Sequence, residues 1–183
     1  MTATSPGRPL ERKARGAEVM ASAEGVRAWR DALQGAGARW DTTLCWVKPD
    51  AAPRFNGQGA ARGFECMATA WCGRGHRNWN GGGRRGVFTH LTEKGGHPCA
   101  KPVALMQELV ALYTRPGDLV CDPFMGAGAT GVACLRLGRR FIGIEIDPGH
   151  YTQACERLAA VAAEPPLPFG DPPAQTVLSL GTV

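Results

Sequence analysis

The chain has 183 residues, of which 44% are apolar and 20% are charged, and it carries a net charge of +5 and seven cysteines. This composition is that of one globular α/β domain and argues against a disordered or fibrous chain. Because the cysteines are odd in number and form no Cys-x-x-Cys pair, neither a disulfide framework nor a zinc ribbon is indicated, and no metal site is expected. A cytoplasmic protein is expected, without a membrane segment and with an acidic partner such as nucleic acid.

The first half of the chain predicts strands and one helix after a polar, proline-broken start. Residues 1–16 are basic and lack apolar periodicity, so we expect a flexible arm ahead of a domain that spans 17–162. Apolar residues at helical spacing follow Ser22 and Glu24, either of which suits a helix start. The elements expected here are, in chain order, a strand at 17–21, a helix from Ser22 or Glu24 to about Gly35, and strands at 42–47 and 64–71.

A long loop rich in glycine and arginine is predicted over residues 73–96. Its arginines alternate with glycines and a tryptophan, a composition that suits phosphate contact and base stacking. The competing interpretation is that these charges form only a solvated loop face. The residues that we predict to contact nucleic acid are Arg74, Arg77, Trp79, Arg84 and Arg85.

The second half predicts a β-α-β unit between two further helices. Pro102 occupies the place of a first-turn proline, and an apolar stripe follows it up to Arg115. Asp147 and Pro148 predict the cap and first turn of the last helix. The tail over 163–183 is rich in proline and is expected to be flexible. Between the two helices we expect a strand at 118–121, a helix at 129–137 and a strand at 140–146.

The loop after the 118–121 strand carries the pattern Gly126-x-Gly128-x-x-Gly131, and a carboxylate follows at Glu145. This pattern satisfies the dinucleotide fingerprint and, taken alone, favours NAD. In a dinucleotide site, however, the first glycine comes directly off the strand, so that backbone amides meet the pyrophosphate. Here a segment that begins with Asp122 intervenes, and a carboxylate there repels a pyrophosphate but suits a cofactor with an ammonium and a sulfonium group. Glu145 serves either cofactor, because both carry ribose hydroxyls.

The segment from Asp122 to Gly131, Asp-Pro-Phe-Met-Gly-Ala-Gly-Ala-Thr-Gly, resembles the amino-group DNA methyltransferases of the permuted β class, especially those of phages and prophages. Its neighbours match as well: His-Pro-Cys-Ala-Lys-Pro begins at His97, and Arg-Arg-Phe-Ile-Gly-Ile-Glu ends at Glu145. The likeness extends more weakly over residues 24–89. It implies a Rossmann-like methyltransferase sheet in permuted order, S-adenosylmethionine as cofactor and double-stranded DNA as partner. It also implies methyl transfer to the exocyclic amine of adenine or cytosine, in a restriction-modification or prophage setting.

The resemblance also assigns site residues. The segment just before the predicted helix at Pro102 would border the methionine end of S-adenosylmethionine. The aspartate and the glycine loop would wrap the cofactor, and Glu145 would hold its ribose. The cofactor-binding residues implied in this way are Pro98, Lys101, Pro102, Asp122, Phe124, Gly126, Gly128, Thr130 and Glu145.

One motif of the resembling family has no counterpart in the sequence. In that family a Pro-Pro-aromatic motif, which grips the flipped base, precedes the segment that begins here near Ala17. Residues 1–16 contain nothing like it, and the sequence Asp-Pro-Pro-Ala at Asp171 lacks the aromatic residue, so no catalytic residue is identified. The strand that carries the motif normally lies between the cofactor strand and the strand at 17–21. We therefore expect an incomplete sheet, with its N-terminal strands missing and a gap in its middle.

Three explanations of this gap stay open: an incomplete product of a longer reading frame, a degenerate prophage remnant, and a half that needs a partner chain with the missing strands. Because an open sheet edge invites foreign pairing, we expect the chain alone to be poorly soluble or partly molten and to methylate no DNA. The alternative functions are a non-catalytic remnant or subunit that binds S-adenosylmethionine and DNA and, as a minor alternative, an NAD-dependent oxidoreductase. The target base, the recognition sequence and the oligomeric state stay open.

Overall fold

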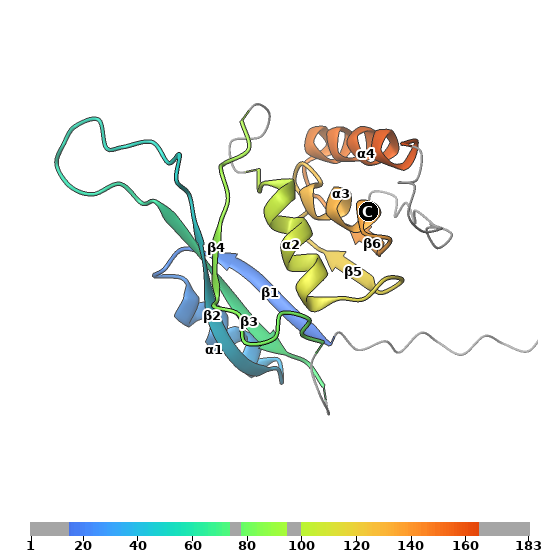
Figure 1. The fold of residues 1–183 in the computed structure, drawn as a ribbon, viewed down its shortest axis with the longest axis horizontal. Helices are drawn as coiled ribbons and strands as arrows, with labels where there is room; N and C mark the ends of the chain where they lie inside the picture. The colour runs from blue at the N-terminus through green and yellow to red at the C-terminus, as the bar shows by residue number, and fades with distance from the viewer. Residues whose placement is uncertain (1–14, 74–77, 95–99, 165–183) are drawn as a thin grey trace, which may run out of the picture.

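The computed structural model of the chain describes residues 15–73, 78–94 and 100–164, and its strands form two sheets with helices packed against them (Figure 1). One sheet has four strands in the order β1-β3-β2-β4, and the other pairs β5 with β6. This is the α/β architecture that the sequence predicts. The predicted flexible arm, up to residue 14, and the predicted tail, from residue 165, lie outside the described residues. None of the helices within these ranges has the length and apolarity that a membrane span requires.

The four-stranded sheet is built from the first half of the chain. Its strands are, in chain order, β1 (Gly16–Ala21), β2 (Arg39–Val47), β3 (Phe64–Trp71) and β4 (Val87–Thr89). β3 runs antiparallel to β1 and β2, whereas β4 runs parallel to β2. Side chains alternate between the two faces of a strand, so Leu44 and Trp46 of β2 lie on one face, with Met67 of β3 opposite Leu44. β4 lies inside the region predicted as a loop, because Phe88 pairs with Trp46 and joins the same buried cluster.

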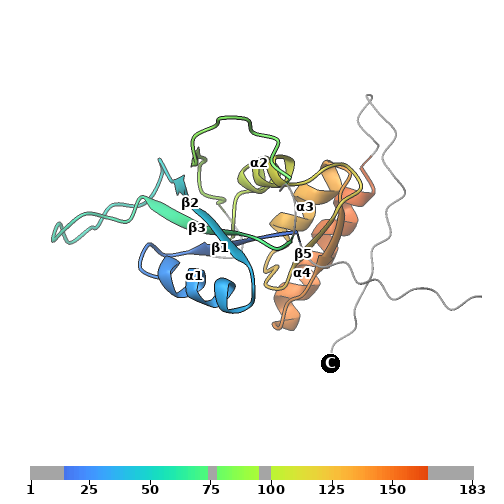
Figure 2. The ribbon, with the colours of Figure 1, turned by 90° about the horizontal axis from the view of Figure 1, so that it is seen from below.

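The helix α1 (Val26–Gly35) lies on the other side of this sheet from the helix α2 (Figure 2). It starts later than predicted. The Ser22 side chain accepts a hydrogen bond from the Gly25 N–H at 3.1 Å in a turn ahead of the helix, and Gly25 rather than Ser22 or Glu24 is the N-cap. No residue of α1 is fully buried, so its apolar stripe is only partly enclosed.

The second half forms the predicted β-α-β unit between two helices. Its elements are, in chain order, α2 (Val103–Tyr113), β5 (Leu119–Asp122), α3 (Ala129–Arg136), β6 (Arg140–Gly143) and α4 (Pro148–Ala162). Pro102 is the N-cap of α2 rather than its first helical residue. The parallel strand β6 ends at Gly143 rather than at Ile146, because its partner β5 ends at the residue that pairs with Gly143. Asp147 caps α4 as predicted and accepts a hydrogen bond from the His150 N–H at 2.9 Å.

A gap divides the two sheets, as the sequence predicts. Among the described residues, β1 pairs only with β3 and β5 pairs only with β6, so β1 and β5 are both edge strands. In Figure 1, β5 is the strand of the second sheet that lies towards β1, and the two arrows run in the same direction. The helix α2 holds the two parts together. Leu105 and Leu109 belong to the core of the first sheet, whereas Val110 packs with Ala133 of α3.

Candidate cofactor site

The loop between β5 and α3 is organised around the carboxylate of Asp122, the last residue of β5. One oxygen of this carboxylate accepts a hydrogen bond from the Phe124 N–H at 3.0 Å. The other accepts one from the Thr130 hydroxyl, in the first turn of α3, at 2.6 Å. The aspartate therefore spans the loop and has a fixed orientation at the carboxyl end of its strand.

Two glycines of this loop adopt backbone conformations that L side chains rarely adopt. Gly126 has a φ of +48° and Gly128 a φ of +76°. Gly128 is also the N-cap of α3, and a Cβ there would lie 3.2 Å from the Cβ of Ala154 in α4. At Gly131 a Cβ would lie 2.7 Å from side-chain atoms of Leu158 and Phe141, so the third glycine of the pattern serves the close packing of α3.

Glu145 approaches the same loop from the residues after β6. Its two oxygens accept hydrogen bonds from the Gly126 N–H at 2.9 Å and from the Asp147 N–H at 3.0 Å. The pKa of Glu145 lies below its ordinary value, chiefly because the Asp147 N–H donates to it; partial burial opposes this shift and the Gly126 N–H adds to it. A carboxylate oxygen has two lone pairs, so the ionised group keeps acceptor capacity for ligand hydroxyls.

Two apolar side chains beside this carboxylate are exposed. Phe124 is 80% exposed and Ile146 is 97% exposed. Both lie within two residues of the hydrogen bond between Gly126 and Glu145. The sequence pattern indicated Phe124 but not Ile146, because the strand predicted at 140–146 includes this isoleucine among its apolar residues. Each offers exposed apolar surface within two residues of a group in this hydrogen bond.

An ion pair links the glycine loop to the start of α2. Glu93 accepts a hydrogen bond from the Val103 N–H at 3.3 Å and pairs with Arg157 of α4 at 2.5 Å. Arg157 also donates to the backbone oxygen of Ala127 in the glycine loop at 3.3 Å. Neither charged residue of this clamp was predicted, since the two are far apart in the sequence and belong to no motif.

The predicted residues ahead of α2 have different positions. Pro98 lies outside the described residues, and Pro102 is buried at the start of α2. Lys101 forms a salt bridge with Glu65 of β3 at 3.2 Å, and the other oxygen of Glu65 pairs with Lys48. Burial by itself would raise the pKa of Glu65, but the hydrogen bonds and charges of the two lysines outweigh it and hold the pKa below its ordinary value.

The residues predicted to contact DNA have different surroundings, and two of them are not described. Arg74 and Arg77 lie outside the described residues. Trp79 packs edge-on against Tyr113 of α2, with ring centroids 5.2 Å apart, and its ring N–H donates to the Gly82 oxygen at 2.7 Å. Arg85 is exposed. The Trp79 ring is partly buried at the periphery of the core, and base stacking by this residue stays a prediction.

Arg84 is also engaged within the fold. Its guanidinium pairs with Glu108 of α2 and lies over the Phe88 ring, 5.0 Å from its centroid. The second oxygen of Glu108 lies 2.6 Å from a ring nitrogen of His90. These contacts tie the segment around β4 to α2, which sequence composition alone does not indicate. Within the part of the chain that the structure describes, no group of three His, Cys, Asp or Glu side chains has a metal-binding arrangement.

Comparisons with known proteins agree with this arrangement. A family model described as a DNA methylase, of the N6/N4 methyltransferase type, matches residues 68–156. The type II methyltransferase M2.DpnII of Streptococcus pneumoniae is 44% identical over 77 residues, which is 41% of this chain but only 29% of that protein. The match thus spans less than a third of the length of this curated relative.

Solved structures share the fold over most of the chain. The crystal structure of the M1.HpyAVI–SAM complex has a TM-score of 0.71 and 30% sequence identity, and the likeness covers 78% of this chain and 74% of that chain. The PvuII DNA methyltransferase, described as cytosine-N4-specific, has a TM-score of 0.63 at 15% identity, over 77% of this chain and 62% of that chain. With its glycine loop, its acidic residue after β6 and this coverage of a relative, the chain belongs to the N6/N4 DNA methylase family.

Proposed function

We propose that the chain binds S-adenosylmethionine at the glycine loop and provides the cofactor half of a DNA methyltransferase that acts on the exocyclic amine of adenine or cytosine. One observation carries the proposal. Asp122 is the last residue of β5, and Glu145 comes two residues after the end of β6, the parallel strand beside it. A backbone N–H of the glycine loop donates a hydrogen bond to each carboxylate. The carboxyl ends of parallel strands are the usual place for ligands in such sheets. Two carboxylates there match the cations and ribose hydroxyls of S-adenosylmethionine and repel a pyrophosphate.

In this proposal each part of the site has a distinct task. Glu145 accepts hydrogen bonds from the ribose hydroxyls, and Phe124 and Ile146 flank the adenine ring with their exposed surfaces. Asp122 attracts the positively charged methionine end. The bound cofactor supplies an electrophilic methyl group for transfer. The clamp of Glu93 and Arg157 keeps the glycine loop and the start of α2 at a fixed separation.

The DNA substrate follows from the family. An exocyclic amine is unreachable inside the base stack, so such a target base must leave the duplex before the methyl group is transferred. The sequence Asp-Pro-Pro-Ala at Asp171, the one weak candidate for the base-gripping motif, lies outside the described residues. Among the described residues, none is therefore assigned the task of holding the target base.

A second candidate function is a non-catalytic subunit that binds S-adenosylmethionine and DNA. The separation of the two sheets favours it, because β1 and β5 both present an unpaired edge within the described residues. A strand that carries the base-gripping group would pair with both edges. On this view the second polypeptide, which carries the base-gripping group, is the catalytic subunit, and this chain supplies only binding.

Isothermal titration of the purified chain with S-adenosylmethionine tests the cofactor proposal. We expect binding of one molecule, and we expect Asp122→Asn and Glu145→Gln each to weaken it about tenfold to a hundredfold, as the loss of a charged hydrogen-bond partner of roughly 1.5–3 kcal/mol implies. Asp31→Asn is the matched control. Among the described residues, Asp31 forms ion pairs only with Arg27 and Arg30, on the surface of α1. A folded chain that binds NADH but not S-adenosylmethionine would contradict the proposal.

Transfer of labelled methyl groups to duplex DNA tests whether the chain needs a second polypeptide for catalysis. We expect the chain alone to bind S-adenosylmethionine and to transfer nothing, because its described residues include no base-gripping group. Transfer by the purified chain alone would establish it as a complete enzyme and would rule out the subunit.

A further inference from the structure

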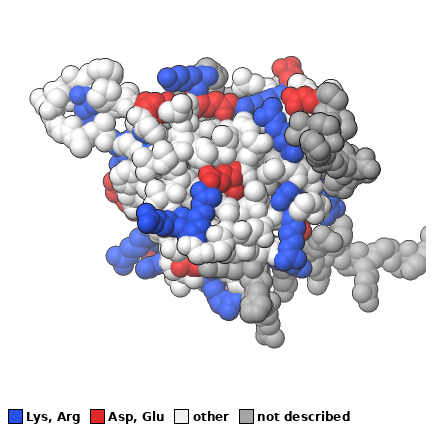
Figure 3. Space-filling view, in the orientation of Figure 1, with Lys and Arg blue, Asp and Glu red and all other residues white. Residues whose placement is uncertain are grey.

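The connection between β2 and β3, residues 48–63, forms an arm that projects from the body of the molecule (Figures 1 and 3). Residues 52–60 are all exposed. Residues 51–63 contain Arg54 and Arg62 and no acidic residue. Phe55 is 91% exposed, although an aromatic ring ordinarily gains free energy from burial. Glycines with positive φ, Gly57 at +63° and Gly59 at +142°, shape the tip.

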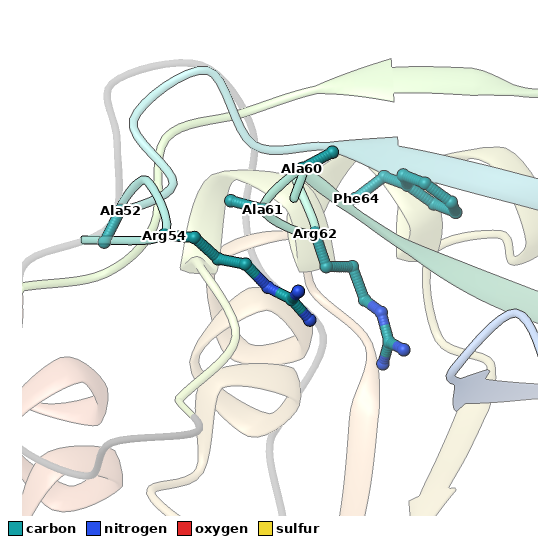
Figure 4. Close-up of a pocket in the computed structure, with 6 residues that line it drawn as sticks. All are labelled: Ala52, Arg54, Ala60, Ala61, Arg62 and Phe64. Carbon is teal, nitrogen blue, oxygen red and sulfur yellow. The ribbon is translucent and has the colours of Figure 1, made fainter. Parts of the chain in front are cut away.

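The arm borders an open, shallow hollow of about 480 Å³ that both arginines line (Figure 4). Alanines form much of its remaining wall, so it has room for a bulky group next to the guanidinium groups. In Figure 4 the side chains of Arg54 and Arg62 extend in the same direction from the two limbs of the arm. Arg62 pairs with Glu24 at 3.0 Å, and both side chains are more than half exposed. Such a surface pair is weak and screened by salt, so it exchanges readily for a phosphate.

The root of the arm lies at the same edge of the fold as the glycine loop. Asp50 accepts hydrogen bonds from the N–H and the hydroxyl of Thr92, at 2.9 and 2.8 Å. The next residue, Glu93, pairs with Arg157, which contacts Ala127 of the glycine loop. A continuous set of described contacts thus connects the arm to the candidate cofactor site.

We propose that this arm is a DNA-binding element in which Arg54 and Arg62 contact backbone phosphates and Phe55 stacks on a base. The inference rests on the proposed function in one respect only, that the substrate is DNA. Planar guanidinium groups bind phosphate oxygens in a bidentate manner, and an exposed aromatic ring stacks on bases of any sequence. The absence of acidic residues in the arm over 51–63 and the net charge of +5 make a polyanion the matching partner. The sequence pattern did not indicate Phe55 as a DNA contact.

Fluorescence anisotropy of a short labelled duplex with the purified full chain, at several salt concentrations, tests the arm. We expect Arg54→Gln with Arg62→Gln to weaken binding about tenfold or more and to lower the slope of log affinity against log salt by about two, one unit for each phosphate contact. We expect Phe55→Ala to weaken binding about fivefold to a hundredfold, the range of a lost stacking contact, with the slope unchanged.

A charge-matched control separates specific contact from net charge. Arg27→Gln with Arg30→Gln removes the same charge from the exposed surface of α1, where both arginines pair with Asp31. Equal losses in the arm and control variants would overturn the proposal, as would a chain that binds no duplex. Sedimentation of Phe55→Ala provides a further check: a changed oligomeric state with unchanged DNA affinity would make Phe55 a contact between copies instead.

The outcome is independent of the cofactor pocket. We expect titration with S-adenosylmethionine to give the same affinity for the arm variants as for the unaltered chain. If the chain binds DNA through the arm but binds no S-adenosylmethionine, the arm inference stands and the proposed function fails. If the chain binds S-adenosylmethionine and the arm variants bind DNA as tightly as the unaltered chain, the proposed function stands and the arm inference fails.

Discussion

Asp122 and Glu145 lie at the ends of neighbouring strands, and the same loop holds both, but the groups that hold them differ. Asp122 uses both oxygens within the loop, one for a backbone N–H and one for the Thr130 hydroxyl. Glu145 uses both for backbone N–H groups, one of them in the glycine loop. Both carboxylates are therefore oriented before any ligand arrives. Orienting groups in advance lowers the entropy that binding must offset.

The glycine at position 128 combines two separate constraints, and a pair of alanine substitutions separates them. Gly128 has a φ of +76°, and a Cβ there would lie only 3.2 Å from Ala154, whereas Gly37 has a similar φ of +85° and open space around it. We expect Gly37→Ala to lower the free energy of unfolding by about 1–2 kcal/mol, the cost of the left-handed conformation. We expect Gly128→Ala to cost more, because it also pushes α3 away from α4.

Urea unfolding of the two variants measures this difference, and titration with S-adenosylmethionine adds a second readout. We expect Gly37→Ala to leave the affinity unchanged and Gly128→Ala to reduce it, because Gly128 belongs to the candidate site. Equal unfolding free energies for the two variants would mean that α4 does not restrict the loop.

At the scale of elements, local patterns predicted most of the fold. The strand β3 has the predicted bounds, 64–71, since turn residues flank an apolar run on both sides. The aspartate, the glycines and Glu145 are adjacent in sequence to the strands that position them, so their convergence was predictable. Contacts between distant segments were not. Glu93 and Arg157 are 64 residues apart, and nothing in either neighbourhood indicates the other. The composition around Arg84 suggested a DNA contact, but the structure pairs Arg84 with Glu108 of α2. Nothing in the sequence near Arg84 indicates that partner, because it belongs to a later helix.

The clamp between Glu93 and Arg157 predicts that one residue of α4 positions the glycine loop without being part of it. We expect Arg157→Gln to weaken S-adenosylmethionine binding about tenfold, in line with roughly 1.5 kcal/mol for a charged hydrogen bond. We expect Arg157→Lys to recover part of this loss, because a lysine keeps the charge but not the forked geometry. Hydrogen exchange of the loop amides should accelerate in Arg157→Gln.

Arg136 provides the control for this clamp. Arg136 pairs with Glu164 at 3.6 Å on the exposed side of α3. Among the described residues this arginine has no contact with the glycine loop, so Arg136→Gln removes an arginine without touching the loop. We expect unchanged affinity and unchanged exchange for this variant. A clamp variant that behaves like the control would show that the loop keeps its conformation without Arg157.

At the scale of the whole molecule, α2 is the structural link between two sheets that do not pair with each other. Its leucines pack against the four-stranded sheet, while Met106 and Val110 contact the cluster around α3. Helix packing holds the parts together but leaves backbone groups of β1 and β5 unpaired along their edges within the described residues. Unpaired edges favour association with another strand, whether from a partner or from a second copy. Leu119 of β5 is 41% exposed and adds apolar surface to one of them.

This arrangement predicts that the purified chain associates as its concentration rises. Sedimentation velocity should show larger species at higher concentration, and Leu119→Lys should reduce them, because a charge on an edge strand opposes strand pairing. Leu91→Lys is the control, since Leu91 is 63% exposed and lies outside both sheets. We also expect a polypeptide that supplies the intervening strand to suppress association and to slow hydrogen exchange in both β1 and β5. A chain that stays monomeric, with slow exchange along β5 in the absence of any partner, would mean that the gap between the sheets is closed in solution.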